Sequence, residues 1–173
     1  MTRWLVGDGI DIGCGPDPLK VECGTVRPWD IPDGDAQYME GVPDDHYDFV
    51  HSSHCLEHME NATIALENWV RICRPGGHLV IMVPDEDLYE QGIFPSTFNS
   101  DHKWTFTLSK PSLKSWSTRS MNLMSLLNPE NAYLPVSVLK IELLDEHFDY
   151  NGPRRDQTLG ASESAIELVL RKR

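Results

Sequence analysis

A glycine-rich turn beside an acidic residue is the part of this sequence most suited to ligand chemistry. The segment DIGCGPD, residues 11–17, follows an apolar stretch over residues 9–12 that is typical of a short buried strand. Glycines in such a turn allow positive φ angles and a close approach of backbone to ligand. Asp11 precedes the glycines, and its carboxylate is suited to a cationic amino group. Taken alone, the turn fits close packing of a helix equally well.

Two further acidic positions favour an adenosine-containing ligand. Asp30 ends a second expected strand, residues 25–29, where a carboxylate can accept hydrogen bonds from two vicinal ribose hydroxyls. The stretch GDAQ, residues 34–37, places the acid Asp35 beside the backbone amide of Ala36. This pair matches the exocyclic amine and a ring nitrogen of adenine.

A group of polar residues follows a third expected strand, YDFVH, residues 47–51. Ser52, Ser53 and His54 come directly after it, and His54 is the candidate general base because that position opens on the ligand pocket. No other catalytic residue is assigned, because a reaction that depends mainly on aligning its two reactants does not need an acid–base pair.

The residues His51, His54, Cys55 and His58 invite a metal interpretation, because His54 and His58 are spaced to share one face of a helix. We expect no metal here. His51 ends a buried strand, which directs its side chain elsewhere, and His58 is interpreted as a packed histidine that braces the loop.

The remaining elements indicate an α/β layered fold with a largely parallel sheet. Residues 61–74 have helical spacing of apolar side chains, with Asn61 as N-cap and Pro75-Gly76-Gly77 as the stop. Residues 78–83 form a continuous apolar run typical of a central parallel strand. The last two strands are expected over residues 136–144 and 165–170, and a helical stretch over residues 113–127.

Residues 84–135 differ in composition, being richer in Ser, Asn, Pro and aromatic residues. We interpret them as an insertion on a single domain of residues 1–173, serving as a lid. The candidates for an acceptor site in this segment are Asp85, Tyr89, His102 and Trp104. A competing interpretation is that Trp104 and Phe106 alternate into the core of an ordinary hairpin.

Composition limits the classes of partner. The chain of 173 residues has a formal net charge of −12, which disfavours nucleic acid and anionic membranes as partners because like charges repel. No apolar run is long enough to span a bilayer or act as a signal peptide, so a cytoplasmic protein with four reduced cysteines is expected. The expected ligand pocket beside the glycine turn also needs a cover, which either residues 84–135 or a second copy of the chain in a homodimer must provide.

In their order along the chain, these pieces resemble the class I S-adenosylmethionine-dependent methyltransferases, in their small-molecule, type 11-like branch. The matching segments are DIGCGPD, DIPDGDAQ, YDFVHSSHCLEHM and RICRPGGHLVIMVP. The resemblance implies a Rossmann-like α/β fold with a mostly parallel seven-stranded sheet and an antiparallel last strand. Residues 16–29 alone separate Gly15 from Asp30, so the first crossover must be compact, with its helix short or replaced by loop.

The resemblance also implies S-adenosylmethionine as cofactor and S-adenosylhomocysteine as product. The methionine end is expected to meet Asp11, Gly13, Cys14 and Gly15, with Ser52, Ser53 and His54 as the adjoining wall. The adenosine end is expected to meet Asp30, Ile31, Asp35 and Ala36.

The expected reaction is methyl transfer to an oxygen or nitrogen of a small or medium-sized acceptor, by in-line displacement. Two alternatives stay open: a non-catalytic S-adenosylmethionine sensor or scaffold, and a dinucleotide-binding oxidoreductase. The oxidoreductase fits less well, because Pro16 and Pro18 lack the amide donors that the pyrophosphate of a dinucleotide would need. The dinucleotide-binding motif GxGxxG/A also requires a small residue at the position of Pro18. Asp17 also stands where the methyltransferases often have a third glycine.

Overall fold

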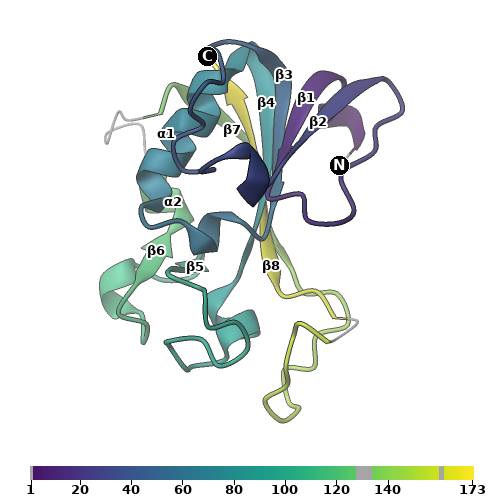
Figure 1. Ribbon diagram of the computed structural model, residues 1–173. Coiled ribbons are helices and arrows are strands. Elements are labelled where there is room, and N and C mark those ends of the chain that lie inside the picture. The colour runs from purple at the N-terminus through teal and green to yellow at the C-terminus, as the bar shows by residue number, and fades with distance from the viewer. Residues whose placement is uncertain (1, 128–133, 160–161) are drawn as a thin grey trace.

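The computed structural model describes residues 2–127, 134–159 and 162–173 (Figure 1). Its centre is one sheet of six strands: β1 (Gly7–Ile12), β2 (Gly24–Trp29), β3 (Tyr47–Ser53), β4 (Cys73–Pro84), β7 (Val136–Leu144) and β8 (Ala165–Lys172). The spatial order of these strands is β2-β1-β3-β4-β8-β7. Each strand expected from the sequence is present, and most are longer by a few residues.

The strand directions confirm the expected fold class. Strands β2, β1, β3 and β4 pair in parallel, whereas β8 runs antiparallel to both β4 and β7. The expected count of seven strands is not met, since this sheet has six within the described residues. The stretch between β2 and β3, residues 30–46, contains the 3-10 helix η2 (Ile31–Asp33) and turns but no strand.

The connection from β1 to β2 contains no helix, as the short spacing predicts. Pro16 and Pro18 lie within it, and proline removes the amide donors that a helix needs. The amides of Gly13 and Cys14 both donate to the carbonyl of Trp29, at 2.9 and 3.3 Å. These bonds hold the start of the connection against the end of β2, and the compact first crossover is therefore confirmed.

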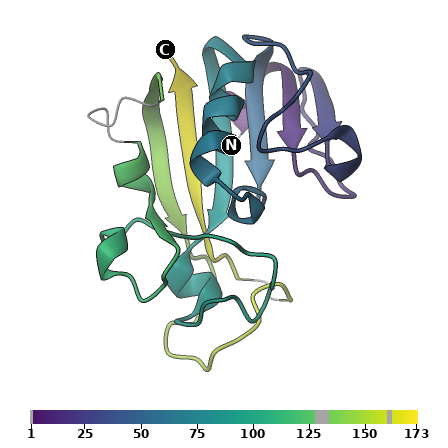
Figure 2. The same ribbon diagram turned by 60° about the vertical axis from the view of Figure 1, so that its left-hand side comes forward.

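One face of the sheet is covered by α1 (Ala62–Ile72), which lies across the strands in Figure 2. Asn61 caps this helix as predicted, because its side-chain oxygen accepts hydrogen bonds from the amides of Thr63 and Ile64. The helix buries Leu66 and Trp69 completely against the sheet. The other face carries a smaller cluster of buried side chains, formed by Leu5, Phe49, Val80 and Val169.

The segment between β4 and β7 is folded differently from the prediction. It contains the π-helix η4 (Glu86–Glu90), the paired strands β5 (Thr105–Thr107) and β6 (Ser120–Asn122), and the short helix α2 (Leu123–Leu126). The helix expected over residues 113–127 is wrong, since only the short α2 lies there. The hairpin alternative is correct in that Phe106 is buried in the core and Trp104 packs against it, but β5 and β6 run in parallel and form no hairpin. Asn122 donates from its side-chain amide to the carbonyls of Leu108 and Lys110, which closes this loop without a longer helix.

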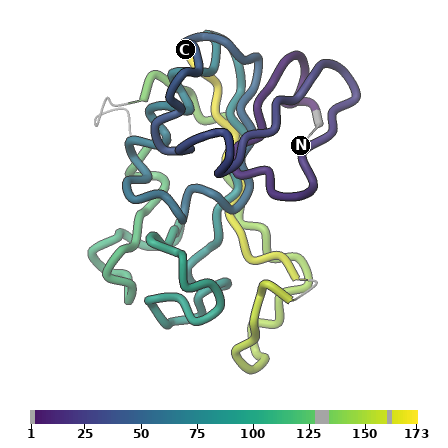
Figure 3. The backbone as a smooth tube through the Cα atoms, viewed as in Figure 1, coloured from purple at the N-terminus to yellow at the C-terminus, as the bar shows by residue number. Residues whose placement is uncertain are grey.

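Two long connections lie at the same edge of the sheet. Because β4 and β7 both run antiparallel to β8, the segment after β4 and the connection from β7 to β8 leave at one end. Figures 1 and 2 both show these segments beyond the carboxyl ends of β3 and β4, and the tube in Figure 3 traces them below the sheet. Parallel sheets bind ligands at this edge. None of the described helices has the length and apolar character that crossing a bilayer requires.

Candidate active site

A pocket of about 460 Å³ lies beside the glycine turn. Its lining comes from the end of β1, the loop that follows and the end of β3, and consists of Asp11, Gly13, Cys14, Asp17, Pro18, Leu19, Lys20, His51 and Ser53. The volume is in the range of small-molecule sites. Four residues expected at the methionine end of the cofactor, Asp11, Gly13, Cys14 and Ser53, therefore border one cavity.

Asp11 is the buried carboxylate of this pocket. Its Oδ2 accepts a hydrogen bond from the amide of Leu19 at 2.8 Å, and its Oδ1 lies 2.6 Å from Nδ1 of His51. Asp11 and His51 face each other in the register of β1 and β3, so their side chains leave the sheet on the same side. His51 was expected to point away from His54 and His58; it lines the first pocket, whereas those two histidines line the second, and its place in this wall was not predicted. Parallel pairing of the two expected strands was the signal that could have revealed it.

The glycine turn is tied to the end of β2 by Asp30. Its Oδ2 accepts a hydrogen bond from the amide of Gly15 at 2.8 Å, and its Oδ1 accepts one from the amide of Ile31 at 2.7 Å. A carboxylate offers about four acceptor positions, so two remain for other donors such as vicinal hydroxyls. Gly13 and Gly15 both have positive φ, of 72° and 56°.

The residues expected near adenine lie along the next turn. The side chain of Ile31 is 89% exposed, an unusual position for an isoleucine that leaves it free to cover one face of a base. Asp35 accepts a hydrogen bond from the amide of Gln37, and the carbonyl of Ala36 accepts one from the indole of Trp69. The amide of Ala36 and the second oxygen of Asp35 are the groups suited to an adenine edge.

Ser52 and Ser53 separate at the end of β3. Ser52 is fully buried and donates its hydroxyl to the carbonyl of Ile12 at 3.0 Å, so it joins β3 to β1 and does not line the pocket. Ser53 does line it. Beneath the turn, the Cys55 side chain fills the space next to Gly13, and burial raises the pKa of its thiol to about 12. Cys55 is therefore a packing residue rather than a nucleophile.

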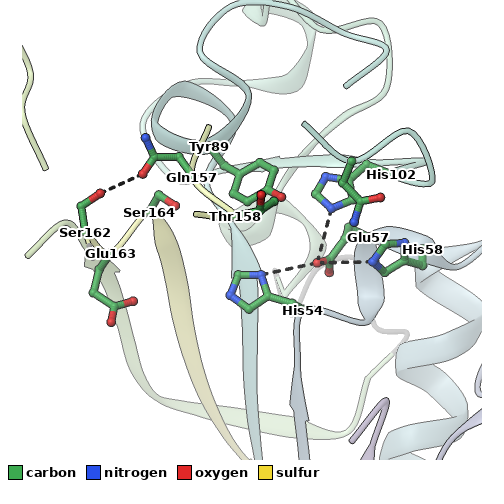
Figure 4. Close-up of a pocket in the computed structure, with 11 residues that line it drawn as sticks. His54, Glu57, His58, Tyr89, His102, Gln157, Thr158, Ser162, Glu163 and Ser164 are labelled. Atoms are coloured by element: carbon green, nitrogen blue, oxygen red, sulfur yellow. Dashed lines mark hydrogen bonds and ion pairs between the residues drawn. The ribbon is translucent and has the colours of Figure 1, made fainter. Parts of the chain in front are cut away.

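A second pocket, of about 450 Å³, lies beyond the end of β3 (Figure 4). Three segments line it: the turn after β3 with the 3-10 helix η3 (Leu56–His58), the insertion, and the connection from β7 to β8. The lining residues are His54, Glu57, His58, Tyr89, Asn99, His102, Gln157, Thr158, Ser162, Glu163 and Ser164. Almost all of them are polar or ionisable.

His54 is placed at the entrance to this second pocket. Its backbone has a φ of 53°, in the left-handed region that a residue with a side chain rarely adopts, and its amide donates to the carbonyl of Met82. Burial acts to lower the pKa of His54, but Glu57 and Glu163 outweigh it and hold this pKa above the ordinary value. The imidazole is thus more basic than a free histidine.

Of the acceptor-site candidates in the insertion, Tyr89 and His102 line the second pocket, and their rings pack with centroids 5.0 Å apart. Burial, together with the charges of Glu90 and Glu57, raises the pKa of Tyr89 to about 12, so its hydroxyl stays protonated. Asp85 and Trp104 lie outside the lining. Asp85 caps η4, and the Trp104 indole donates to the carbonyl of Met59.

Two groups in the second pocket were missed by the sequence argument. Glu57 stands within SSHCLEH, three residues after His54, and that spacing was the available signal. Residues 157–158 and 162–164 carried no such signal, because a polar loop far along the chain gives no hint of where it returns. They come to the pocket because β8 is antiparallel and its entry lies at the carboxyl edge of β4.

The linings of the two pockets contain consecutive residues at the end of β3. Ser53 lines the first and His54 lines the second, and consecutive residues are only about 3.8 Å apart between Cα atoms. The two pockets are therefore bordered by the same short stretch of chain.

Comparisons with known proteins define the class. Residues 5–131 match the family model described as a methyltransferase domain. The chain belongs to this family, and it is an S-adenosylmethionine-dependent methyltransferase. Among curated proteins, none matches the sequence significantly.

Solved structures share the fold at low sequence identity. A protein of Listeria monocytogenes assigned to the S-adenosylmethionine-dependent methyltransferases matches with a TM-score of 0.60 at 9% identity, over 100% of this chain and 94% of the other. A SAM-dependent methyltransferase from Archaeoglobus fulgidus matches with 0.58 at 15%, over 99% and 88%. A Haloferax volcanii protein, described as a methyltransferase in complex with the activator Trm112, matches with 0.54 at 14%, over 98% and 85%.

The first pocket fits this cofactor. It offers the buried carboxylate of Asp11, which suits a cationic amino group, and the carboxylate of Asp30 lies next to this lining, bonded to the Gly15 amide. A Cβ added at Gly15 would have no atom within 4 Å, so the turn presents open backbone on that side. Pro16 and Pro18 withdraw donors that only a phosphate would need, and S-adenosylmethionine has none.

Proposed function

We propose that this methyltransferase transfers the methyl group to an oxygen or nitrogen atom of a small or medium-sized polar acceptor held in the second pocket. The observation that carries the proposal is the adjacency of Ser53 and His54, which places the two pockets on either side of one peptide unit. In-line displacement needs the donor and acceptor on opposite sides of the methyl group. Two pockets bordered by consecutive residues of one chain segment support this arrangement.

The cofactor is proposed to lie along the glycine turn and the end of β2. Asp11 receives the amino group, with Gly13, Cys14, Gly15 and Ser53 around the methionine end. Asp30 receives the ribose hydroxyls, and Ile31, Asp35 and Ala36 border the adenine. Ser52 acts indirectly, because its bond to the Ile12 carbonyl fixes the end of β3.

The chemistry of the second pocket supports a polar acceptor. Its lining offers imidazoles, carboxylates, amides and hydroxyls, with Tyr89 as its aromatic wall. A formal net charge of −12 supports a small acceptor over a nucleic acid, whose phosphates the protein would repel. In this proposal residues 84–135 are the lid of a single domain, and residues 157–158 and 162–164 complete the wall. Four free thiols fit a cytoplasmic protein.

His54 is proposed as the base that takes the proton released by the acceptor. It lines the second pocket and directly follows Ser53 of the first, and the nearby carboxylates raise its pKa. The sulfonium of the bound cofactor supplies the activated methyl group. The protein contributes alignment, exclusion of water by the lid, and removal of the proton once the acceptor nucleophile is committed.

A two-part experiment tests this function. Calorimetric titration measures binding of S-adenosylmethionine, S-adenosylhomocysteine and NADH, and release of S-adenosylhomocysteine is then followed against a library of polyhydroxylated and amine acceptors. We expect binding of the first two ligands, and turnover with a polar acceptor that falls at least tenfold in His54→Gln. Cofactor binding without turnover on any acceptor would point to the sensor alternative, and a response to NADH alone would overturn the proposal.

His46→Ala is the matched control. His46 is exposed and directly precedes β3, at the opposite end of this strand from the pockets. The variant should leave both binding and turnover at the level of the parent protein. A loss equal to that of His54→Gln would show that the effect comes from general loss of structure.

A further inference from the structure

Glu57 is a buried carboxylate without a conventional partner. Its side chain is fully buried on η3, and neither carboxylate oxygen has a hydrogen-bond partner within the described part of the chain. Burying an unpaired carboxylate costs several kcal/mol or more, so a group in this position is normally protonated, paired or bound to a cation. The question is what the oxygens of Glu57 face.

Three imidazole nitrogens face Glu57 Oε1 (Figure 4). Nδ1 of His54 lies 3.5 Å away, Nε2 of His102 lies 3.9 Å away and Nε2 of His58 lies 4.0 Å away. These separations are longer than normal hydrogen bonds. The insertion is fixed here by its backbone, since the amides of Lys103 and Trp104 both donate to the Glu57 carbonyl. The nitrogens are thus close to the carboxylate but not bonded to it.

The outer nitrogens of two of these rings are held by acceptors. Nδ1 of His102 lies 2.6 Å from Oε1 of the buried Glu90. Nδ1 of His58 lies 3.0 Å from Oδ2 of Asp101 and 3.2 Å from the Asp101 carbonyl. An acceptor on Nδ1 keeps the proton there, so the neutral ring carries its lone pair on Nε2. Both lone pairs are then aimed at the space beside Glu57.

We propose that Glu57, His58 and His102 bind a divalent transition-metal ion. A carboxylate behind a histidine is the usual outer support of a metal-ligating imidazole, and Glu90 and Asp101 supply it here. Ligand atoms of Glu57, His58 and His102 all lie within 4.8 Å of one another. In a tetrahedral site with metal–ligand distances of about 2.0–2.2 Å, the ligand atoms lie roughly 3.3–3.6 Å apart, so side-chain rotations that close the widest separation by about 1.2–1.5 Å form the site.

The donor set selects the kind of ion. Two imidazole nitrogens with one carboxylate oxygen suit Zn²⁺ and its first-row neighbours, whereas Mg²⁺ and Ca²⁺ prefer all-oxygen sites. The bound cation would neutralise the Glu57 charge that is otherwise buried alone. All three side chains line the second pocket, so an ion among them would keep a coordination position directed into it.

The location gives the ion a role that rests on the proposed function. A metal at this place would bind a hydroxyl or carboxylate oxygen of the acceptor and hold it beside His54, which directly follows Ser53 of the cofactor pocket. It would thereby favour oxygen acceptors over amines. The metal site itself is argued from geometry alone, and it can be tested without cofactor or acceptor.

The test uses the full-length protein after chelator treatment and dialysis. Isothermal titration with Zn²⁺ alone should show one site per chain, and elemental analysis after gel filtration should show one equivalent retained. Co²⁺ should bind at the same site, giving visible d–d absorption of the intensity typical of nitrogen and oxygen ligands at low coordination number. Mg²⁺ at the same concentration should compete poorly with both ions.

Variants distinguish a specific metal site from nonspecific binding of the ion to exposed side chains. His102→Ala and Glu57→Gln should each weaken Zn²⁺ binding roughly a hundredfold or more, and Glu90→Gln, which changes only the outer support, roughly ten- to a hundredfold. His46→Ala, at an exposed histidine, should bind Zn²⁺ like the parent protein. S-adenosylmethionine titration should stay unchanged in Glu90→Gln, which shows that this variant is folded.

The outcomes are distinct from those of the methyl-transfer test. Absence of Zn²⁺ and Co²⁺ binding by the parent protein would overturn the metal site, even if methyl transfer were found. Binding that survives in His102→Ala and Glu90→Gln would also overturn it, because the ion would then lie elsewhere. One equivalent of metal lost in these variants would support the site, even if every acceptor tried were the wrong one.

Discussion

The Asp11 carboxylate lies 2.6 Å from Nδ1 of His51, across the adjacent parallel strands β1 and β3. Both side chains are buried, and the second oxygen of Asp11 holds the amide of Leu19. One carboxylate therefore joins two strands to the loop that replaces the first crossover helix. The same carboxylate faces the cofactor pocket, so stability of the loop and affinity for the cofactor depend on one group.

Substitution of His51 by alanine should affect both properties. The variant leaves the Asp11 carboxylate buried with one partner fewer, which should lower the free energy of unfolding by about 2 kcal/mol. It should also weaken S-adenosylmethionine binding about tenfold, because Asp11 is no longer held in one orientation. Urea denaturation and calorimetric titration measure the two effects. Unchanged stability together with unchanged affinity would show that the pair is incidental.

The two glycines of the turn should respond differently to the same change. A Cβ at Gly13 would lie 2.6 and 2.7 Å from the side-chain atoms of Cys55, whereas one at Gly15 would meet nothing within 4 Å. Both have positive φ, so each alanine carries a strain of about 1 kcal/mol. Gly13→Ala adds overpacking of about 1–3 kcal/mol.

Thermal or urea unfolding of Gly13→Ala and Gly15→Ala, measured side by side, tests this difference. Gly15→Ala serves as the control for left-handed strain alone. Equal destabilisation in the two proteins would mean that the contact between Gly13 and Cys55 relaxes without cost.

The elements that the sequence predicted well are those whose own residues determine them. Asn61 caps α1 through local hydrogen bonds, and the apolar face of this helix follows from the spacing of its own side chains. The compact crossover followed from the short spacing between Gly15 and Asp30. In each of these cases the residues that form the sequence pattern are the same residues, or close neighbours of the residues, whose structure the pattern predicts.

The parts that failed depend on contacts between distant segments. Residues 113–127 have apolar side chains suited to a helix, but β6 pairs with β5 and Asn122 bonds back to Lys110, and these contacts override the local preference. The proximity of His102 to Glu57 was likewise not predicted, because His102 lies in an insertion whose return to η3 no local pattern reveals.

Glu86 should be the main polar anchor of the insertion. It is fully buried, accepts hydrogen bonds from the hydroxyls of Thr105 and Ser115, and lies 3.0 Å from Nζ of Lys110. Removing one partner of a buried ion pair leaves the others unsatisfied, so Glu86→Ala should lower the free energy of unfolding by about 3 kcal/mol. Hydrogen exchange should show the greatest loss of protection between β4 and β7.

Asp87→Asn is the matched control for that prediction. Asp87 also pairs with Lys110, but 45% of its side chain is exposed, so the change should cost less than about 1 kcal/mol. If the two variants were equally stable, Glu86 would not be the anchor.

Asp30 should control cofactor affinity with little effect on the core. Asp30→Ala removes both the proposed ribose acceptor and the bond to the Gly15 amide, and should weaken S-adenosylmethionine and S-adenosylhomocysteine equally, by about tenfold to a hundredfold. Asp30→Asn, which retains one carbonyl oxygen, should lie between it and the parent protein. A selective loss of one ligand would contradict a contact made to the ribose, which the two molecules share.

Asp85 should make the protein less stable as the pH rises through the weakly acidic range. Burial raises the pKa of Asp85 from 3.8 to about 6, although the amides of Asp87 and Leu88 partly offset this. Between about pH 4 and pH 6 the folded state then keeps a proton that the unfolded state has released, so the free energy of unfolding falls as pH increases.

Asp85→Asn removes this titration while its side-chain oxygen can still accept from the two amides of η4. The variant should match the parent protein near pH 4 and exceed its free energy of unfolding by about 3 kcal/mol at pH 7, as a shift of two pKa units corresponds to that energy. Urea denaturation across pH 4–7 measures the difference. Asp17→Asn, at a side chain that is 87% exposed, should follow the parent profile. If the free energies of unfolding of Asp85→Asn and of the parent protein changed in parallel with pH, the Asp85 carboxyl would ionise in the folded state as easily as in the unfolded state.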